Sequence, residues 1–591
     1  MKNFNLPYLL ILVLLAISFT GCNDDFLTRT PLDEISDETF WETENDLRVF
    51  NNSLYHMTLN EFDVPILMGH PSGSGAQAWR GSLWFQDGFS DNLAPHHDRH
   101  TYFQQVRAGK HNIPTSAQDF GYRGWNFVRS ANVGLENYDR ASVSEEIINR
   151  YAAEARLFRG WFYAEKVSKF GDVPWVDRPL NIDSEELYAA RTPREEAMEY
   201  VLEDLQFATE FLPDDWGDGD DPGRLNRWDA LLVLSRVALF EGSWRKYHDG
   251  EDPDRWFQIA ADAAREVMDN SPHSVYSTED PENDFNAYHR LTDLAGNPEV
   301  MYWRKYEHGV YDNLVHGYFG YTGGATKSFV DDFLATDGLP ITLSPLYQGD
   351  EQIEDLFENR DPRLRQTILH PDDSDRYRYN RDDGRDYPRM QGMGGFTTAT
   401  GYHIIKVYNA DEHGLVGDPS ILAAINLRYG EVLLNYAEAM AELGTITQND
   451  LDISINLLRD RVDMPHLELD PPMDPRYADD GISPLLVEIR RERRIELFLE
   501  GHRYNDLRRW GQGSKLEEPT LGIRWNDAAA QRYEGAEVQT AQDPVSGNTY
   551  IDVYQGTDWA DPVFDESRHY LWPIPLSVLS QNPDIGQNPG W

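Results

Sequence analysis

Residues 427–443 read LRYGEVLLNYAEAMAEL, and this stretch decides the fold class. Its apolar side chains recur three and four positions apart, the spacing that places them on one face of an amphipathic α-helix. Segments 147–170 and 228–247 show the same periodicity. The chain is therefore predicted to be mostly α-helical, with further helices over 44–58, 124–140, 193–211, 254–269, 450–462 and 484–500.

The three strongest helices begin alike. Each opens on an arginine followed by an aromatic residue, and an aliphatic residue comes four positions after that aromatic, as the pairs Arg150-Tyr151, Arg227-Trp228 and Arg428-Tyr429 show. Matched positions in successive helices predict tetratricopeptide-like helix hairpins, in which each unit buries its apolar face against the next. Strand-like alternation is sparse and occurs over 299–303, 401–407 and 550–553.

Long polar connections separate these helices, notably 213–223, 371–395 and 465–482. Connections of this length in a compact protein are usually functional or disordered. None has the low-complexity composition of an interdomain linker. Residues 22–591 are therefore predicted to form one unit, a helical repeat scaffold interleaved with variable loops at 66–103, 304–324 and 371–400.

The charge balance excludes some classes of partner. The 591 residues include 53 Lys and Arg against 101 Asp and Glu, which gives a net charge of −48. Non-specific nucleic-acid binding depends on cations that neutralise phosphates, so no nucleic-acid partner is expected. Adhesion to an anionic lipid surface is disfavoured for the same reason.

The N-terminus is predicted to be a signal peptide, residues 1–21, followed by an anchor. Lys2 is followed by an apolar run from Leu6 to Phe19, which is too short to span a bilayer as a helix. The small residues Thr20 and Gly21 follow, and then Cys22, the one cysteine of the chain, so no intrachain disulfide can form. The pattern resembles a bacterial lipoprotein signal in which Cys22 takes the lipid. The alternative is an ordinary secretory signal with an incidental cysteine.

No recognised catalytic motif occurs in the sequence, and no enzyme activity is predicted. The hydrolase nucleophile elbow, the Walker loop and the dinucleotide fingerprint are all missing. The group His96, His97, Asp98 and His100 completes no known metal motif, and a polar loop is the alternative. No cofactor is expected, although calcium could bind the oxygen-rich segment that contains Asp214, Asp215, Asp218, Asp220 and Asp221, for which a solvated turn is the alternative.

Aromatic residues outside the predicted helices carry the functional prediction. They gather in two glycine-containing stretches, around 79–84 and 303–321. A ring face offers a flat apolar platform for the CH face of a sugar, while neighbouring polar groups bond its hydroxyls. The alternative is that these rings pack under the loops. The predicted glycan-binding residues are Trp79, Arg80, Trp84, Tyr306, Tyr311, Asn313, Tyr318 and Tyr321.

Short motifs occur in a fixed order along the whole chain. They lie at 31–33 with 39–41, 154–159, 170–174, 223–225, 331–333 with 337–338, 359–363, 428–439, 492–496, 571–575 and 587–591. In this order they resemble the SusD/RagB family of Bacteroidetes outer-membrane lipoproteins; no single motif is decisive, and their order makes the resemblance specific. The sequence Asn23-Asp24-Asp25 after Cys22 also resembles a surface-export signal of such lipoproteins.

The resemblance implies a SusD-like fold with an irregular, loop-rich ligand-binding half. It also implies a non-enzymatic role at the cell surface, where a lipid-anchored protein captures glycan and acts as the lid of a SusC-like TonB-dependent transporter in the outer membrane. Some relatives serve peptide import, so a peptide-binding lid is the alternative. An enzyme, such as a glycosidase, and a lid that binds no ligand alone are further alternatives.

Overall fold

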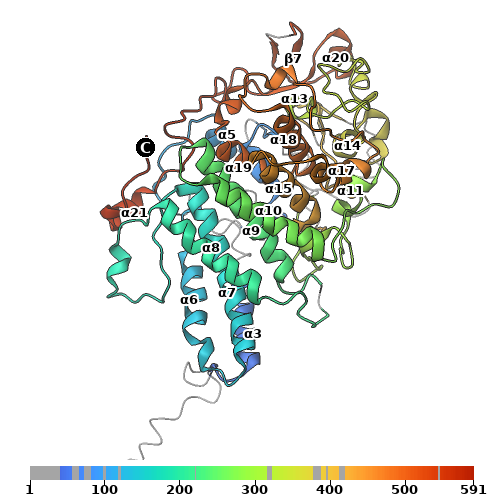
Figure 1. Cartoon of the computed structure of the whole chain (residues 1–591). Coiled ribbons are helices and arrows are strands. Elements are labelled where there is room, and N and C mark those ends of the chain that lie inside the picture. The colour runs from blue at the N-terminus through green and yellow to red at the C-terminus, as the bar shows by residue number, and fades with distance from the viewer. Residues whose placement is uncertain are drawn as a thin grey trace, which may run out of the picture.

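Long helices make up one half of the molecule, and loops with short helices and strands make up the other (Figure 1). The predicted mostly α-helical class is therefore confirmed. The predicted signal peptide and Cys22 lie outside the described residues. The structure, a computed structural model, describes residues 40–55, 66–71, 82–96, 101–117, 121–219, 221–315, 323–376, 388–394, 397–410, 419–543 and 546–591.

The long helices pack one on the next in chain order. Contacts join α6 to α7, α7 to α8, α8 to α9, α9 to α10, α10 to α15 and α15 to α18. The consecutive pairs α7–α8 and α9–α10 are the hairpins that the repeated helix openings predict. The bounds are α3 (Glu44–Asn52), α6 (Trp125–Asn137), α7 (Glu145–Phe170), α8 (Arg194–Phe211), α9 (Arg227–Tyr247), α10 (Pro253–Asn270), α15 (Tyr429–Glu442) and α18 (Pro484–Glu496).

Local sequence fixes the ends of these helices. The Ser144 hydroxyl caps α7, and Gly171, at φ 70°, ends it. The Asn226 side chain accepts hydrogen bonds from the first turn of α9, and the Asp229 side chain accepts one from the backbone N–H of Asn226 in return. Such caps satisfy N–H groups that have no partner within the helix. The predicted helices 147–170 and 228–247 are confirmed to within two residues.

Three predicted helices differ from the structure. Of the described part of segment 44–58, only Glu44–Asn52 is α-helical, as α3. Segment 450–462 forms α16 (Gln448–Asp452) and α17 (Ile455–Asp460), because Ser454 between them leaves helical geometry, with φ −133° and ψ −93°. α18 ends at Glu496 rather than at 500, and Leu499 beyond it has a left-handed φ of 65°. Apolar periodicity predicts which face of a helix is buried and is less informative about single residues that break the backbone pattern.

The strands of the described residues form three small antiparallel sheets. Predicted strands 299–303 and 550–553 correspond to β2 and β7, whereas 401–407 is wrong, since Ile404 makes a single bridge to Ile368. The sheets are β1 (Leu93–Ala94) with β3 (Gly324–Ala325), β2 (Val300–Arg304) with β4 (Ala424–Arg428), and β5 (Leu521–Arg524) with β7 (Thr549–Asp552) and β6 (Thr540–Gln542).

Short helices occupy the rest of the described chain. The loop-rich half, at the upper right of Figure 1, contains α11 (Asp284–Ala287), α13 (Lys327–Val330), α14 (Arg363–Thr367) and α20 (Asp527–Arg532). The other short helices are α5 (Thr101–Arg107), α19 (Arg503–Arg509) and α21 (Leu576–Gln581), with 3₁₀ turns that include η3 (Trp84–Phe89), η6 (Glu185–Tyr188) and η13 (Pro583–Ile585). No helix of the described residues has the length and apolarity needed to cross a membrane.

A buried network of charges joins α15, α18 and the loop-rich half. Arg428, just before α15, bonds Glu299 (2.8 Å), Glu496 (2.9 Å) and Glu500 (2.7 Å). Arg363, just after Asp361 and Pro362, bonds Glu496 as well (3.2 Å). Several of the motifs in the SusD/RagB resemblance therefore meet in one place. We call Arg363, Lys406, Arg428, Arg461, Glu299, Glu492, Glu496 and Glu500 the central ion network.

Candidate functional site

The bases of two predicted binding loops lie together beside the β2–β4 sheet. The backbone N–H of Leu314 donates to the carbonyl of Pro71 (2.6 Å). Asn313 and Ser420 form a two-way backbone bridge, which fixes the loop against the chain leading into β4. Segments far apart in the sequence, 66–71 and 304–315, are thus held together by hydrogen bonds; 66–71 is mostly buried, and 307–312 is exposed or partly exposed.

A tight hairpin, residues 305–312, leads out of β2 and positions Tyr311. Glu307 and Tyr311 pair through their backbones, and Gly309, at φ 76°, provides the left-handed turn residue between them. The Asp312 carboxylate accepts from the Gly309 N–H (3.2 Å) and lies 2.8 Å from Nδ1 of His308. We call this segment the Tyr311 hairpin; its tip carries exposed polar groups around one partly exposed ring.

Three rings stack from the interior toward this hairpin. The rings of Tyr306 and Tyr311 are 5.4 Å apart and only 8° from parallel, and His70 lies 6.1 Å beyond Tyr306 at 19°. The Tyr306 hydroxyl accepts from the N–H of His70 (2.7 Å). A Cβ at Gly69 would lie 2.2 Å from that hydroxyl, so glycine is required for this close approach. The buried rings therefore hold Tyr311 in a fixed orientation.

Charge at the stack is set by burial and by one arginine. Burial lowers the pKa of His70 to about 4, so the imidazole is neutral at pH 7 and its Nε2–H donates to the Ala423 carbonyl (3.0 Å). Arg304 donates to the Tyr311 hydroxyl (2.9 Å), and its guanidinium lies 4.9 Å from the centre of the Tyr311 ring. The site thus combines an oriented ring with the partly exposed carboxylate of Asp312, while the buried Arg304 holds the ring hydroxyl. Such groups can stack on a sugar ring and bond its hydroxyls.

The structure separates the predicted site residues into three groups. Tyr311 is partly exposed at the hairpin. Trp84 (1% exposed, stacked on Phe85 at 4.1 Å), Tyr306 (3%) and Asn313 (0%) are interior. Asn313 uses its side-chain N–H to bond the Leu422 carbonyl (3.0 Å). These three predictions are corrected here, because a buried side chain offers no open surface to a ligand. Trp79, Arg80, Tyr318 and Tyr321 lie outside the described residues.

Sequence reasoning missed Gly69, His70 and Arg304. Arg304 directly follows the buried strand residue Trp303. A cation at the end of a strand, next to an aromatic-rich loop, is a sequence pattern that could have identified Arg304 as part of the site. His70 carries no such signal, because its role depends on a contact across 236 positions of the chain. Only the folded chain brings these residues to Tyr311.

The carboxylates considered for calcium have partners within the protein. Asp218 pairs with Arg48 (3.3 Å), and Asp221 accepts from the Trp303 indole (3.0 Å) and the Gly296 N–H (3.1 Å). Asp220 lies outside the described residues. Within the described part of the chain, no three metal-ligating side chains gather at one point, and His97, Asp98 and His100 lie outside that part.

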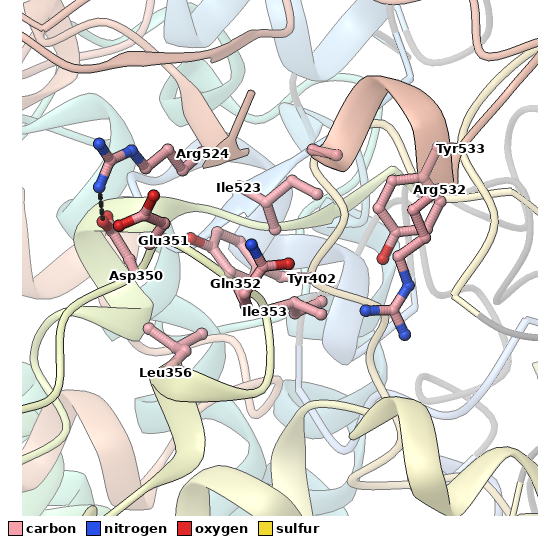
Figure 2. A pocket seen from close by; sticks show the side chains of 11 residues that line it. Asp350, Glu351, Gln352, Ile353, Leu356, Tyr402, Ile523, Arg524, Arg532 and Tyr533 are labelled. Carbon is pink, nitrogen blue, oxygen red and sulfur yellow. Dashed lines mark ion pairs between the residues drawn. The ribbon is translucent and has the colours of Figure 1, made fainter. Parts of the chain in front are cut away.

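A small polar pocket, separate from the Tyr311 hairpin, lies between residues 350–356 and 523–533. Figure 2 shows Arg524 directed at Asp350, an ion pair of 3.5 Å, with Tyr402 and Ile523 at the centre and Tyr533 at the far side. Its free volume is only ≈ 20 Å³. A cavity of that size holds about one or two waters, whereas ligand pockets span roughly 300–1,000 Å³. This pocket is therefore too small for a sugar ring.

Two family profiles and several known proteins are similar to this chain. The profile described as "SusD family" matches residues 292–591, and the one described as "Starch-binding associating with outer membrane" matches 90–239. SusD-like protein P2 of Formosa agariphila is 24% identical over the full length of both chains.

Solved structures show the same fold. A SusD-like protein from Bacteroides fragilis has a TM-score of 0.69 at 24% identity, covering 95% of this chain and all of that one. A SusD-like carbohydrate-binding protein from the same species has a TM-score of 0.68 at 22% identity, covering 93% and 100%. A laminarin-binding SusD-like protein has a TM-score of 0.56 at 19% identity, with the same coverage. The predicted SusD-like fold is confirmed by these similarities.

Proposed function

This chain belongs to the SusD family, and from that premise we propose that it is a cell-surface lipoprotein that captures oligosaccharide or polysaccharide and delivers it to a SusC-like TonB-dependent transporter in the outer membrane. The proposed role is binding without catalysis. Cys22 would carry the lipid anchor, and the transporter would be the protein partner. The observation that carries the proposal is the stack that fixes Tyr311 at a partly exposed hairpin.

Several features support a glycan as the ligand. Tyr311 is backed by a buried ring, so binding does not have to order it, and pre-organisation reduces the cost of association. Arg304 is buried and holds the Tyr311 hydroxyl in place, and the partly exposed carboxylate of Asp312 supplies a hydrogen-bond acceptor. Two similar proteins are named for carbohydrate and laminarin binding, and one matching profile is described by starch binding and the outer membrane. Trp79, Arg80, Tyr318 and Tyr321 complete the proposed site.

The test is a binding screen of the protein lacking residues 1–22. Neutral polysaccharides, anionic polysaccharides and mixed peptides are immobilised, and retention of the protein is measured together with release of reducing sugar ends. We expect selective retention by a polysaccharide without hydrolysis. Retention by peptides alone would support the peptide-import alternative, and hydrolysis abolished by one carboxylate substitution would support an enzyme.

Tyr311→Ala is expected to weaken glycan binding about 5- to 30-fold, the effect of losing roughly 1–2 kcal/mol of stacking and apolar contact. Because Tyr311 is at the surface of its stack, the melting temperature should change little. Isothermal titration calorimetry with the retained glycan measures the effect. Tyr311→Phe is the matched control and should keep most of the affinity, since the ring remains. Wild-type affinity in Tyr311→Ala would exclude this hairpin from the site.

A further inference from the structure

A large groove lies on the helical half, where the first turn of α6 faces the loop 174–189 and the C-terminal segment α21–η13. Its volume is ≈ 860 Å³, within the range of roughly 300–1,000 Å³ typical of ligand pockets. Trp125 lines it from α6, Tyr163 from α7, Tyr122 from the segment before α6, and Tyr188 from the loop. We call this feature the side groove. None of its lining residues belongs to the Tyr311 hairpin or to the segment 66–71.

The loop that forms the outer wall is fixed in place. Val173 and Thr192 exchange backbone hydrogen bonds (3.2 and 2.9 Å), which closes the loop at its base. The Asn132 amide donates to the Val176 carbonyl (2.9 Å), and the Asn582 amide holds the far end of the loop (2.9 Å). Figure 1 shows this loop projecting beside α6 and α21. The groove is therefore pre-formed rather than created by a ligand.

The walls combine a rigid ring with exposed apolar side chains. Trp125 is partly exposed and is held edge-on against Phe162 (5.6 Å) and Tyr163 (5.9 Å). On the opposite wall, Tyr188 is 62% and Leu187 45% exposed, although both are large apolar residues. Exposed aromatic and apolar side chains around a concavity mark binding sites. A planar ring such as that of Tyr188 suits the CH face of a sugar.

The charge of the groove is opposite to that of the chain. Its charged lining residues are Arg123, Arg129 and Arg178 against the single acid Glu186, whereas the whole chain carries −48. Arg129 bonds the Leu180 carbonyl and Arg178 pairs with Glu186, so these two cations are held at the loop. The first turn of α6 also lines the groove and has no side-chain cap, which adds the partial positive charge of a helix N-terminus. Anionic groups are favoured here, and guanidinium groups suit carboxylate and sulfate.

We propose that the side groove is a second carbohydrate site that takes an anionic oligosaccharide, with a sugar ring against Tyr188 and Trp125 and its carboxylate or sulfate groups near the arginines. The inference rests on the proposed function for the general class of ligand. It goes beyond that function in assigning a separate site and a charged sugar. The Tyr311 hairpin and the side groove would then bind independently.

The experiment measures calorimetric binding of three tetrasaccharides to the protein lacking residues 1–22: a uronic acid tetramer, a sulfated galactose tetramer and a neutral glucose tetramer. The variants are Tyr188→Ala and Arg123→Gln, both at exposed positions. Tyr188→Phe and Arg140→Gln are the matched controls; exposed Arg140 follows the far end of the same helix, outside the groove. We expect at least one anionic tetramer to bind, with affinity reduced fivefold or more in both test variants and unchanged in the controls and in Tyr311→Ala.

Three outcomes would overturn the inference. Failure of both anionic tetramers to bind would do so. So would anionic binding that Tyr311→Ala abolishes and Tyr188→Ala leaves intact, because the ligand would then occupy the hairpin. Anionic binding that neither Tyr188→Ala nor Arg123→Gln weakens would also overturn it, because the ligand would then lie outside the groove. In the second and third outcomes the proposed glycan function stands, whereas failure in the screen of polysaccharides rejects that function itself.

Discussion

Replacing Arg428 by methionine is expected to lower the free energy of unfolding by about 3–5 kcal/mol, the usual cost of removing one partner from a buried ion pair. The Arg428 side chain is almost fully buried and bonds the carboxylates of Glu299, Glu496 and Glu500. Methionine is unbranched and apolar and carries no charge, so the three carboxylates would lose a shared cation while remaining out of water. Buried charges without sufficient compensation account for the large size of the effect.

The measurement is equilibrium unfolding in urea, read as the shift of the transition midpoint. Arg255→Met is the matched control, because Arg255 also makes a two-pronged bond to a carboxylate, Glu199 (2.8 Å for both contacts), but both side chains are about 40% exposed. Exposed pairs contribute roughly 0–1 kcal/mol. Equal midpoints for Arg428→Met and Arg255→Met would show that the central ion network does not stabilise the fold.

The second large effect is loss of stability in acid. Burial alone would raise the pKa of Glu438, but Arg509 and Arg493 outweigh it and bring the pKa to about 2. At Glu500, Arg428 and Lys406 likewise outweigh burial and give a pKa of about 2, below the ordinary value of 4.5. At about 1.4 kcal/mol per pKa unit, each group contributes about 3 kcal/mol.

The sign of this contribution follows from proton linkage. A carboxyl whose pKa is lower in the folded state binds fewer protons than it does in the unfolded chain. The stabilisation is therefore complete above about pH 4.5 and is lost as the pH falls from 4.5 to about 2. We expect the melting temperature to fall steeply across that range, with a shallower fall in Glu438→Gln. A melting temperature that is constant between pH 5 and 2.5 would contradict this prediction.

The helix α18 shows what a local sequence pattern can predict and what it cannot. Periodicity predicts a helix over 484–500, and α18 forms, but a pattern cannot predict that its run Arg490–Arg494 is buried. These charges enter the interior because carboxylates arrive from distant segments, such as Asp332 to Arg494 (2.6 Å) and Asp506 to Arg493 (2.9 Å).

The same limit applies to the aromatic residues of the candidate site. Their positions on glycine-containing loops predicted a binding role for 66–103 and 304–324, and the structure shows that these loops are hydrogen-bonded to each other at Pro71 and Leu314. Loop position alone could not distinguish Trp84, which packs in η3 under other rings, from Tyr311, which remains partly exposed. Burial depends on which segments cover a ring, and those segments come from elsewhere in the chain.

The sequence by itself determined the helical class, the hairpin repeat and the family, because apolar spacing, helix caps and ordered motifs are local properties of the chain. Tertiary structure alone decided which charges meet in the central ion network, which aromatic rings are exposed and where the side groove lies. Each of these depends on contacts between residues far apart in sequence, whose partners no local pattern specifies. Arg428 and Glu299, 129 positions apart and 2.8 Å from each other, are the plainest case.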